Sequence, residues 1–125
     1  MRVHKIAIPV FDSALTIVEG CSSSGVQEWF RRKYGCDPGI SEDASGAYAI
    51  VEGEDTRNRY VWLARFDWRI ASQACAVHEL FHAAKSILED RGIKDEETVA
   101  YLLTWLVEKV WKFFHRRNPL QKRRS

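Results

Sequence analysis

The 125-residue chain has little of what marks several classes of protein. Its three cysteines, Cys21, Cys36 and Cys75, are an odd number without a Cys-x-x-Cys pair, which excludes a disulfide framework. No apolar run reaches the about 18 residues that a membrane-spanning helix needs. No basic segment followed by an apolar run opens the chain. We therefore expect a cytoplasmic protein without a membrane partner.

The chain also lacks an excess of charge of one sign. It has 19 Lys and Arg against 17 Asp and Glu, a net charge of +2, so its overall charge does not favour a nucleic-acid partner. Basic side chains do gather at the end of the chain, in residues 116–125. We interpret these residues as a solvated tail that follows one domain, residues 1–115; contact with RNA, DNA or an acidic partner is the alternative.

Hydrophobic periodicity predicts an α+β fold. Alternating or β-branched runs predict four short strands, and apolar spacings of three and four predict three helices. The second long helix has Asp95 as its N-cap. Because only residues 91–94 separate it from the first, we expect the two to form an antiparallel pair at the C-terminal end, next to a small antiparallel or mixed sheet and an N-terminal helix. The predicted strands are residues 3–10, 14–18, 47–52 and 60–66, and the predicted helices are 25–34, 68–90 and a segment that follows Asp95.

The segment His78-Glu79-Leu80-Phe81-His82 has the residue types and the spacing of a zinc-binding motif. On a helix, residues i and i+4 share a face, so His78 and His82 can present both imidazoles to one zinc ion. Glu79 then lies close enough to a metal-bound water to act as a general base without being a ligand. The simpler alternative is a surface pair of histidines, with Glu79 in ordinary helical ion pairs.

A catalytic zinc site takes three protein ligands and one water. In an antiparallel pair the first turn of the second helix passes the end of the first, which favours Glu97 as the third ligand. Glu96, about 100° around the helix, then faces solvent. The interpretation as a peptidase requires that His78, His82 and Glu97 converge.

From about Ala71 to Leu106 the chain resembles the gluzincin metallopeptidases, in which a second helix with a ligand Glu follows the helix with the two-His motif. Ala100 matches the small residue that relatives have three positions after that Glu. Tyr101 stands where they have an Asp. The 15 positions from His82 to Glu97 make this a minimal version, similar to small zincin-like proteins encoded by phages and prophages. The resemblance implies a zinc cofactor, a peptide or protein substrate, and Glu79 as the base.

The same resemblance implies a donor to the developing oxyanion and a sheet edge that binds extended substrate. Tyr101, one turn beyond Glu97, is the first candidate for the donor, with Tyr48 and His115 behind it. Residues 47–51 are the candidate edge. Plain packing is the alternative for each.

Two other functions compete with a peptidase. One is a catalytically inactive binding or regulatory module that keeps a zinc site; the presence of Glu79 beside the expected water argues against it. The other is a nucleic-acid-binding protein that acts through the basic tail. A further hypothesis is a homodimer formed through exposed aromatic residues, with Trp105, Trp111 and Phe114 as candidates.

Overall fold

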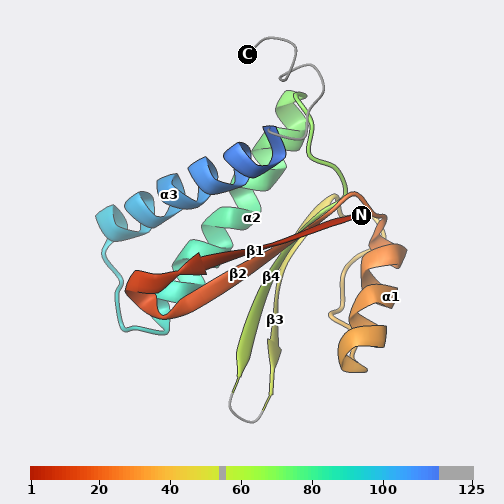
Figure 1. Ribbon diagram of the computed structural model, residues 1–125, viewed down its shortest axis with the longest axis horizontal. Helices are drawn as coiled ribbons and strands as arrows, with labels where there is room; N and C mark the ends of the chain where they lie inside the picture. The colour runs from red at the N-terminus through yellow and green to blue at the C-terminus, as the bar shows by residue number, and fades with distance from the viewer. Residues whose placement is uncertain (54–55, 116–125) are drawn as a thin grey trace.

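Two β-hairpins, joined by one parallel pairing, form the sheet of this protein. In the computed structural model, which describes residues 1–53 and 56–115, β1 (Arg2–Ile8) pairs with β2 (Ser13–Glu19), and β3 (Gly46–Glu52) pairs with β4 (Arg57–Leu63). The strand order is β1-β2-β4-β3, with β2 and β4 parallel (Figure 1). Since both kinds of pairing occur, the sheet is mixed, and the predicted α+β class is confirmed.

The first strand ends at Ile8, two residues before the predicted end at residue 10, because Pro9 has no N–H to donate to a ladder. The residues Pro9–Phe11 form a short 3-10 turn, η1, after which Asp12 adopts a left-handed conformation with φ of 46° and returns the chain into β2. β1 is an edge strand of the sheet, and it ends at the turn that Pro9 begins.

Three helices complete the described fold: α1 (Ser23–Tyr34), α2 (Ile70–Glu89) and α3 (Glu96–His115). α1 begins two residues before its predicted start. The reason is that the Ser22 hydroxyl, and not that of Ser24, caps the helix by accepting a hydrogen bond from the N–H of Gly25. Gly35, with φ of 69°, ends this helix in the left-handed conformation that a residue without Cβ adopts at no steric cost.

Alternate residues of β4 contribute to two separate cores on the two faces of the sheet. Val61 and Leu63 belong to a core with residues of α2 and α3, whereas Tyr60 and Trp62 pack with Val26 and Phe30 of α1. The larger core is centred on the long helices and also contains apolar side chains of β1 and β2. From the strands it includes Ile6, Ile8, Leu15 and Ile17, and from the helices Leu80, Ala83, Ile87, Leu102, Leu106 and Val110.

α3 runs back along α2 after a short turn, with α2 between α3 and the second hairpin (Figure 1). The predicted cap of α3 is confirmed, because the Asp95 carboxylate accepts hydrogen bonds from the backbone N–H of Thr98 at 3.1 Å and from its hydroxyl at 2.8 Å. Leu102, Leu106 and Val110 form its buried face.

The aromatic residues proposed as a dimerisation surface are not an exposed patch. Phe114 is buried, and Trp105 and Trp111 pack partly buried against the larger core. The homodimer therefore stays a prediction, but these three aromatic residues do not form the exposed surface that suggested it. The predicted basic tail, residues 116–125, lies outside the described residues. None of the described helices is both long and apolar enough to cross a membrane.

Candidate metal centre

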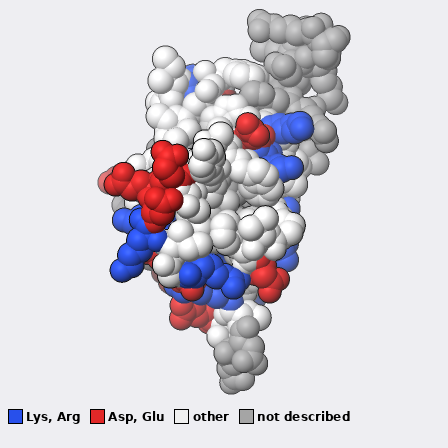
Figure 2. All heavy atoms as spheres, turned by 90° about the vertical axis from the view of Figure 1, so that its left-hand side faces the viewer, with Lys and Arg blue, Asp and Glu red and all other residues white. Residues whose placement is uncertain are grey.

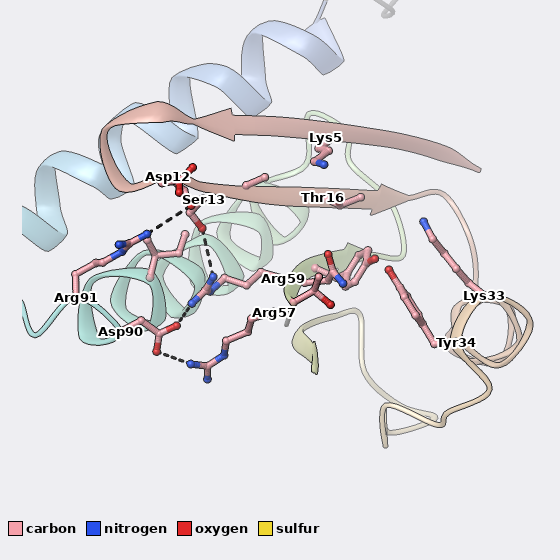
Figure 3. A pocket seen from close by; sticks show the side chains of 15 residues that line it. Lys5, Asp12, Ser13, Thr16, Lys33, Tyr34, Arg57, Arg59, Asp90 and Arg91 are labelled. Carbon is pink, nitrogen blue, oxygen red and sulfur yellow. Dashed lines mark hydrogen bonds and ion pairs between the residues drawn. The ribbon is translucent and has the colours of Figure 1, made fainter. Parts of the chain in front are cut away.

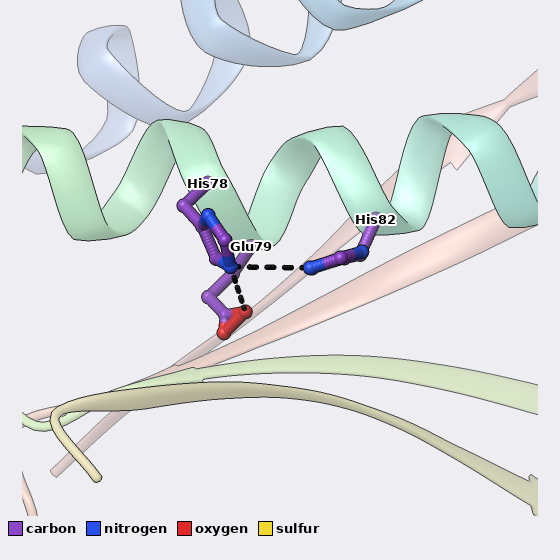
Figure 4. Close-up of side chains that lie close together, drawn as sticks. All are labelled: His78, Glu79 and His82. Carbon is purple, nitrogen blue, oxygen red and sulfur yellow. Dashed lines mark hydrogen bonds and ion pairs between the residues drawn. The ribbon is translucent and has the colours of Figure 1, made fainter.

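The two histidines of the motif lie together on one side of α2. Buried residues such as Leu80 and Ile87 attach α2 to the core, while His78 and His82 are exposed. In Figure 4 both imidazoles leave the helix on the side of the β3 and β4 ribbons, and the α3 ribbon passes on the other side of α2. The helix thus fixes both rings on a face that the core does not occupy.

The separation of the rings suits one shared metal ion. The Nε2 atoms of His78 and His82 are 3.1 Å apart. Two nitrogens that each lie about 2.0–2.1 Å from a tetrahedral zinc ion are about 3.3 Å apart. The arrangement therefore needs only a small adjustment to hold zinc between the two rings.

Glu79 completes a compact group with the histidines. Its Oε1 atom lies 3.9 Å from Nε2 of His78, and one potential ligand atom from each of the three residues lies within 4.8 Å of the others. Glu79 is only 6% exposed, and no hydrogen bond to its carboxylate is found within the described part of the chain. Burial raises the pKa of this carboxyl, while positive charge on His78 and His82 lowers it.

Gly46, at the start of β3, lets the sheet edge approach α2 next to Glu79. A Cβ at this position would lie 2.7 Å from Sγ of Cys75 and 3.2 Å from Cγ of Glu79. Cys75 and Glu79 are one turn apart on α2, so the backbone of β3 passes directly over this part of the helix. β3 is an edge strand of the sheet, as predicted for residues 47–51.

The structure does not bring Glu97 to the histidines. Glu97 is exposed in the first turn of α3, and it lies nine positions, or half a helical turn in phase, from the buried Leu106. It therefore projects from the outward side of α3. Glu96 instead lines a groove between α2 and α3, together with Phe81. Within residues 1–53 and 56–115, the group that could hold a metal ion consists of His78, Glu79 and His82 alone.

The two tyrosine candidates for the oxyanion donor differ in their exposure to solvent. Tyr101 is 73% exposed on α3, one turn beyond Glu97. Tyr48 projects from β3, and its hydroxyl is buried beside Ser86 and Arg59 without a hydrogen bond of ordinary geometry to either. Burial raises the pKa of this phenol, which keeps it a proton donor at neutral pH. Because Ser86 is one turn after His82, Tyr48 lies on the side of the sheet that faces the motif helix.

Sequence reasoning missed a small cavity of about 370 Å³ at the N-terminal end of α2. Its lining includes Cys75, one turn before Glu79, and the basic side chains of Arg65 and Arg69. The signal was present as two arginines, one after β4 and one before α2, but their convergence depends on the loop of residues 64–69, in which both pair with Asp67. Of the remaining tyrosine and histidine candidates, His115 is the last residue of α3, and its side chain lies outside the described part.

Comparison with known proteins finds no matching family model, no matching curated protein and no matching solved structure. The function therefore has to be argued from the residues. On the face in Figure 2, a group of acidic side chains lies next to basic ones, so the basic side chains of this face do not form the extended patch that favours a nucleic acid.

Proposed function

We propose that this protein is a zinc-dependent metallopeptidase in which His78 and His82 hold the metal ion, Glu79 is the general base, and a third ligand, which the described residues do not supply in this arrangement, completes the site. The observation that carries the proposal is the convergence of two imidazole nitrogens, 3.1 Å apart, beside a buried carboxylate on the same helix. Zinc, when bound, supplies an electrophile for the scissile carbonyl and lowers the pKa of a water molecule towards about 7.

The histidines and Glu79 have different roles in the proposed reaction. His78 and His82 orient the site, because their places one turn apart on α2 fix the separation of the two nitrogens. Glu79 accepts the proton of the attacking water and transfers it to the leaving amine.

The edge strand β3 is the proposed docking surface for an extended peptide. An edge strand has backbone N–H and C=O groups free to pair with an added strand, and β3 passes over Glu79 at Gly46. The Tyr48 hydroxyl is buried between this strand and α2, out of reach of a docked peptide, and is not assigned as the oxyanion donor.

The test separates metal binding from catalysis. Zinc content by mass spectrometry is expected to be about one equivalent per chain in wild type, and to fall to background in His82→Ala. Glu79→Gln is expected to keep the zinc and to abolish cleavage of a mixed peptide library, read by mass spectrometry. Glu89→Gln, an exposed carboxylate on the same helix, is the matched control and is expected to cleave as wild type does. Unchanged cleavage in Glu79→Gln would refute the assignment of the base.

A second candidate function is a zinc-binding module without turnover. It is favoured by one observation: in the described residues two imidazole nitrogens converge beside Glu79, and Glu97, the expected third ligand of a catalytic site, does not join them. A wild-type protein that binds zinc through His78 and His82 but cleaves no member of the library would favour this candidate.

A further inference from the structure

The cavity of about 700 Å³ in this fold does not contain the histidine pair. It lies where the two hairpins separate. The parallel pairing of β2 with β4 begins only at Leu15 and Arg59, although the two strands begin at Ser13 and Arg57, so their first residues diverge. Figure 3 shows the cavity between these strand ends, the C-terminal end of α2 and the last turn of α1.

Five basic side chains from four parts of the chain line this cavity. They are Lys5 of β1, Lys33 of α1, Arg57 and Arg59 of β4, and Arg91 just after α2. These residues are far apart in the sequence, and the fold brings them to one concave surface. A concavity with several charges of one sign concentrates the field within it and attracts ions of the opposite sign.

The acidic residues of the lining do not balance this charge. Asp90 forms ion pairs with both Arg57 and Arg59, and Asp12 is the one other carboxylate among the described lining residues; Arg57 also pairs at 3.3 Å with Glu52, which is not part of the lining. Lys5 makes no ion pair within the described part of the chain, and Lys33 contacts only the faces of aromatic rings, among them Tyr34 at 5.7 Å. The two ammonium groups are therefore available to a ligand.

The neutral groups of the lining are mostly hydrogen-bonding groups. Ser13 and Thr16 of β2, Thr56, Asn58 and the Tyr34 phenol all border the cavity. Guanidinium, ammonium and hydroxyl donors together are the set that proteins use for phosphate oxygens. The volume exceeds what a free phosphate ion needs and falls in the range of small-molecule sites.

We propose that this cavity binds a small organic phosphate, with Arg57, Lys5 and Lys33 among the basic side chains that attract and contact it. Arg59 is 7% exposed and fixed by Asp90 and by the Ser13 hydroxyl, so it forms the wall of the site. Burial raises the pKa of Tyr34, which keeps its phenol a donor at neutral pH. The site is separate from the zinc-binding residues and does not depend on them.

The test uses the full chain and three probes: adenosine 5′-monophosphate, adenosine and inorganic phosphate, each at the same ionic strength. Calorimetry is expected to give saturable one-site binding for the monophosphate, weaker binding for inorganic phosphate and none for adenosine. Prior treatment with EDTA is expected to leave the affinity unchanged, which distinguishes this site from a phosphate bound to zinc.

Variants locate the site. Lys33→Ala and Arg57→Ala are each expected to weaken binding of the monophosphate about tenfold, the loss typical of one charged hydrogen bond. Arg32→Ala removes the neighbouring charge on α1, outside the lining, and is expected to change the affinity by less than about twofold. Binding by neither phosphate probe, or equal weakening in Arg32→Ala and Lys33→Ala, would overturn the proposal. Binding of inorganic phosphate as tight as that of the monophosphate would overturn its organic part.

Discussion

Arg59 of β4 and Asp90, which directly follows α2, form an ion pair that ties the sheet to the helix with the histidine motif (Figure 3). Only 7% of the Arg59 side chain is exposed, whereas 29% of Asp90 is exposed. Asp90 also pairs with Arg57 at 2.5 Å. Asp90 thus neutralises the buried guanidinium of Arg59, whereas the accessible guanidinium of Arg57 pairs with both Asp90 and Glu52.

Removal of that carboxylate is expected to be costly. Asp90→Ala leaves the buried Arg59 charge without its partner, and we expect the free energy of unfolding to fall by about 3 kcal/mol in urea denaturation. Arg57→Ala removes only the exposed half of the network and is expected to cost below about 1 kcal/mol. Equal losses in the two variants would show that burial of Arg59 does not determine the cost.

A methyl group at Gly46 is expected to destabilise the contact between β3 and α2. Gly46→Ala places a Cβ 2.7 Å from Sγ of Cys75, and overpacking of this kind costs about 1–3 kcal/mol. Cys75→Ala removes the sulfur atom, so the double variant is expected to lose less stability than the sum of the single variants. Urea denaturation of all four proteins measures this coupling. Additive losses would mean that the backbone oxygen of Trp62, 3.1 Å from the new Cβ, is the obstacle instead.

The cap of α3 is expected to make stability depend on pH. Hydrogen bonds from the side chain and then the backbone of Thr98 lower the pKa of Asp95 below its ordinary value. A lowered folded-state pKa stabilises the fold above the unfolded-state pKa of about 3.9, and the stabilisation is lost as pH falls through the folded-state pKa. Asp95→Asn keeps the acceptor but removes the charge. The wild type is therefore expected to have the higher Tm at neutral pH, with a difference that disappears in acid.

Thr98→Val is the control for this pH dependence. It removes the hydroxyl that donates to Asp95 and keeps the carboxylate, so we expect the pKa of Asp95 to rise toward its ordinary value. NMR titration of the Asp95 carboxyl carbon in both proteins measures that rise. An unchanged pKa would assign the stabilisation to the backbone N–H alone.

Local signals in the sequence were enough to predict most of the elements. Asp95 predicted the start of α3, and the apolar spacing predicted both long helices. These signals act over a few residues and depend on backbone chemistry that is the same in every fold. The parallel pairing of β2 with β4 has no such signal, because it joins residues more than 40 positions apart.

The same contrast between local signals and distant contacts applies to the candidate site. His78, Glu79 and His82 are on one helix, so their spacing alone predicts that they meet. Glu97 is on another helix, and its direction depends on how α3 rotates about its own axis against the core. Burial of Leu102, Leu106 and Val110 sets that rotation. A short connection fixes the antiparallel sense of two helices but leaves the rotation of each undetermined.

The sequence-based hypothesis and the structure differ most clearly in the third ligand, because Glu97 does not lie with the two histidines. With Glu97 exposed on the outward side of α3, we expect Glu97→Ala to bind zinc with the affinity of the wild type, whereas His78→Ala loses it. Zinc at 100 times its Kd raises the free energy of unfolding by about 2.7 kcal/mol, so thermal unfolding with and without zinc reads out both variants. Glu96→Ala is the matched control in the same turn. Loss of the zinc-dependent stabilisation in Glu97→Ala alone would mean that the first turn of α3 rotates toward the histidines when the metal binds, as the resemblance to gluzincins implies.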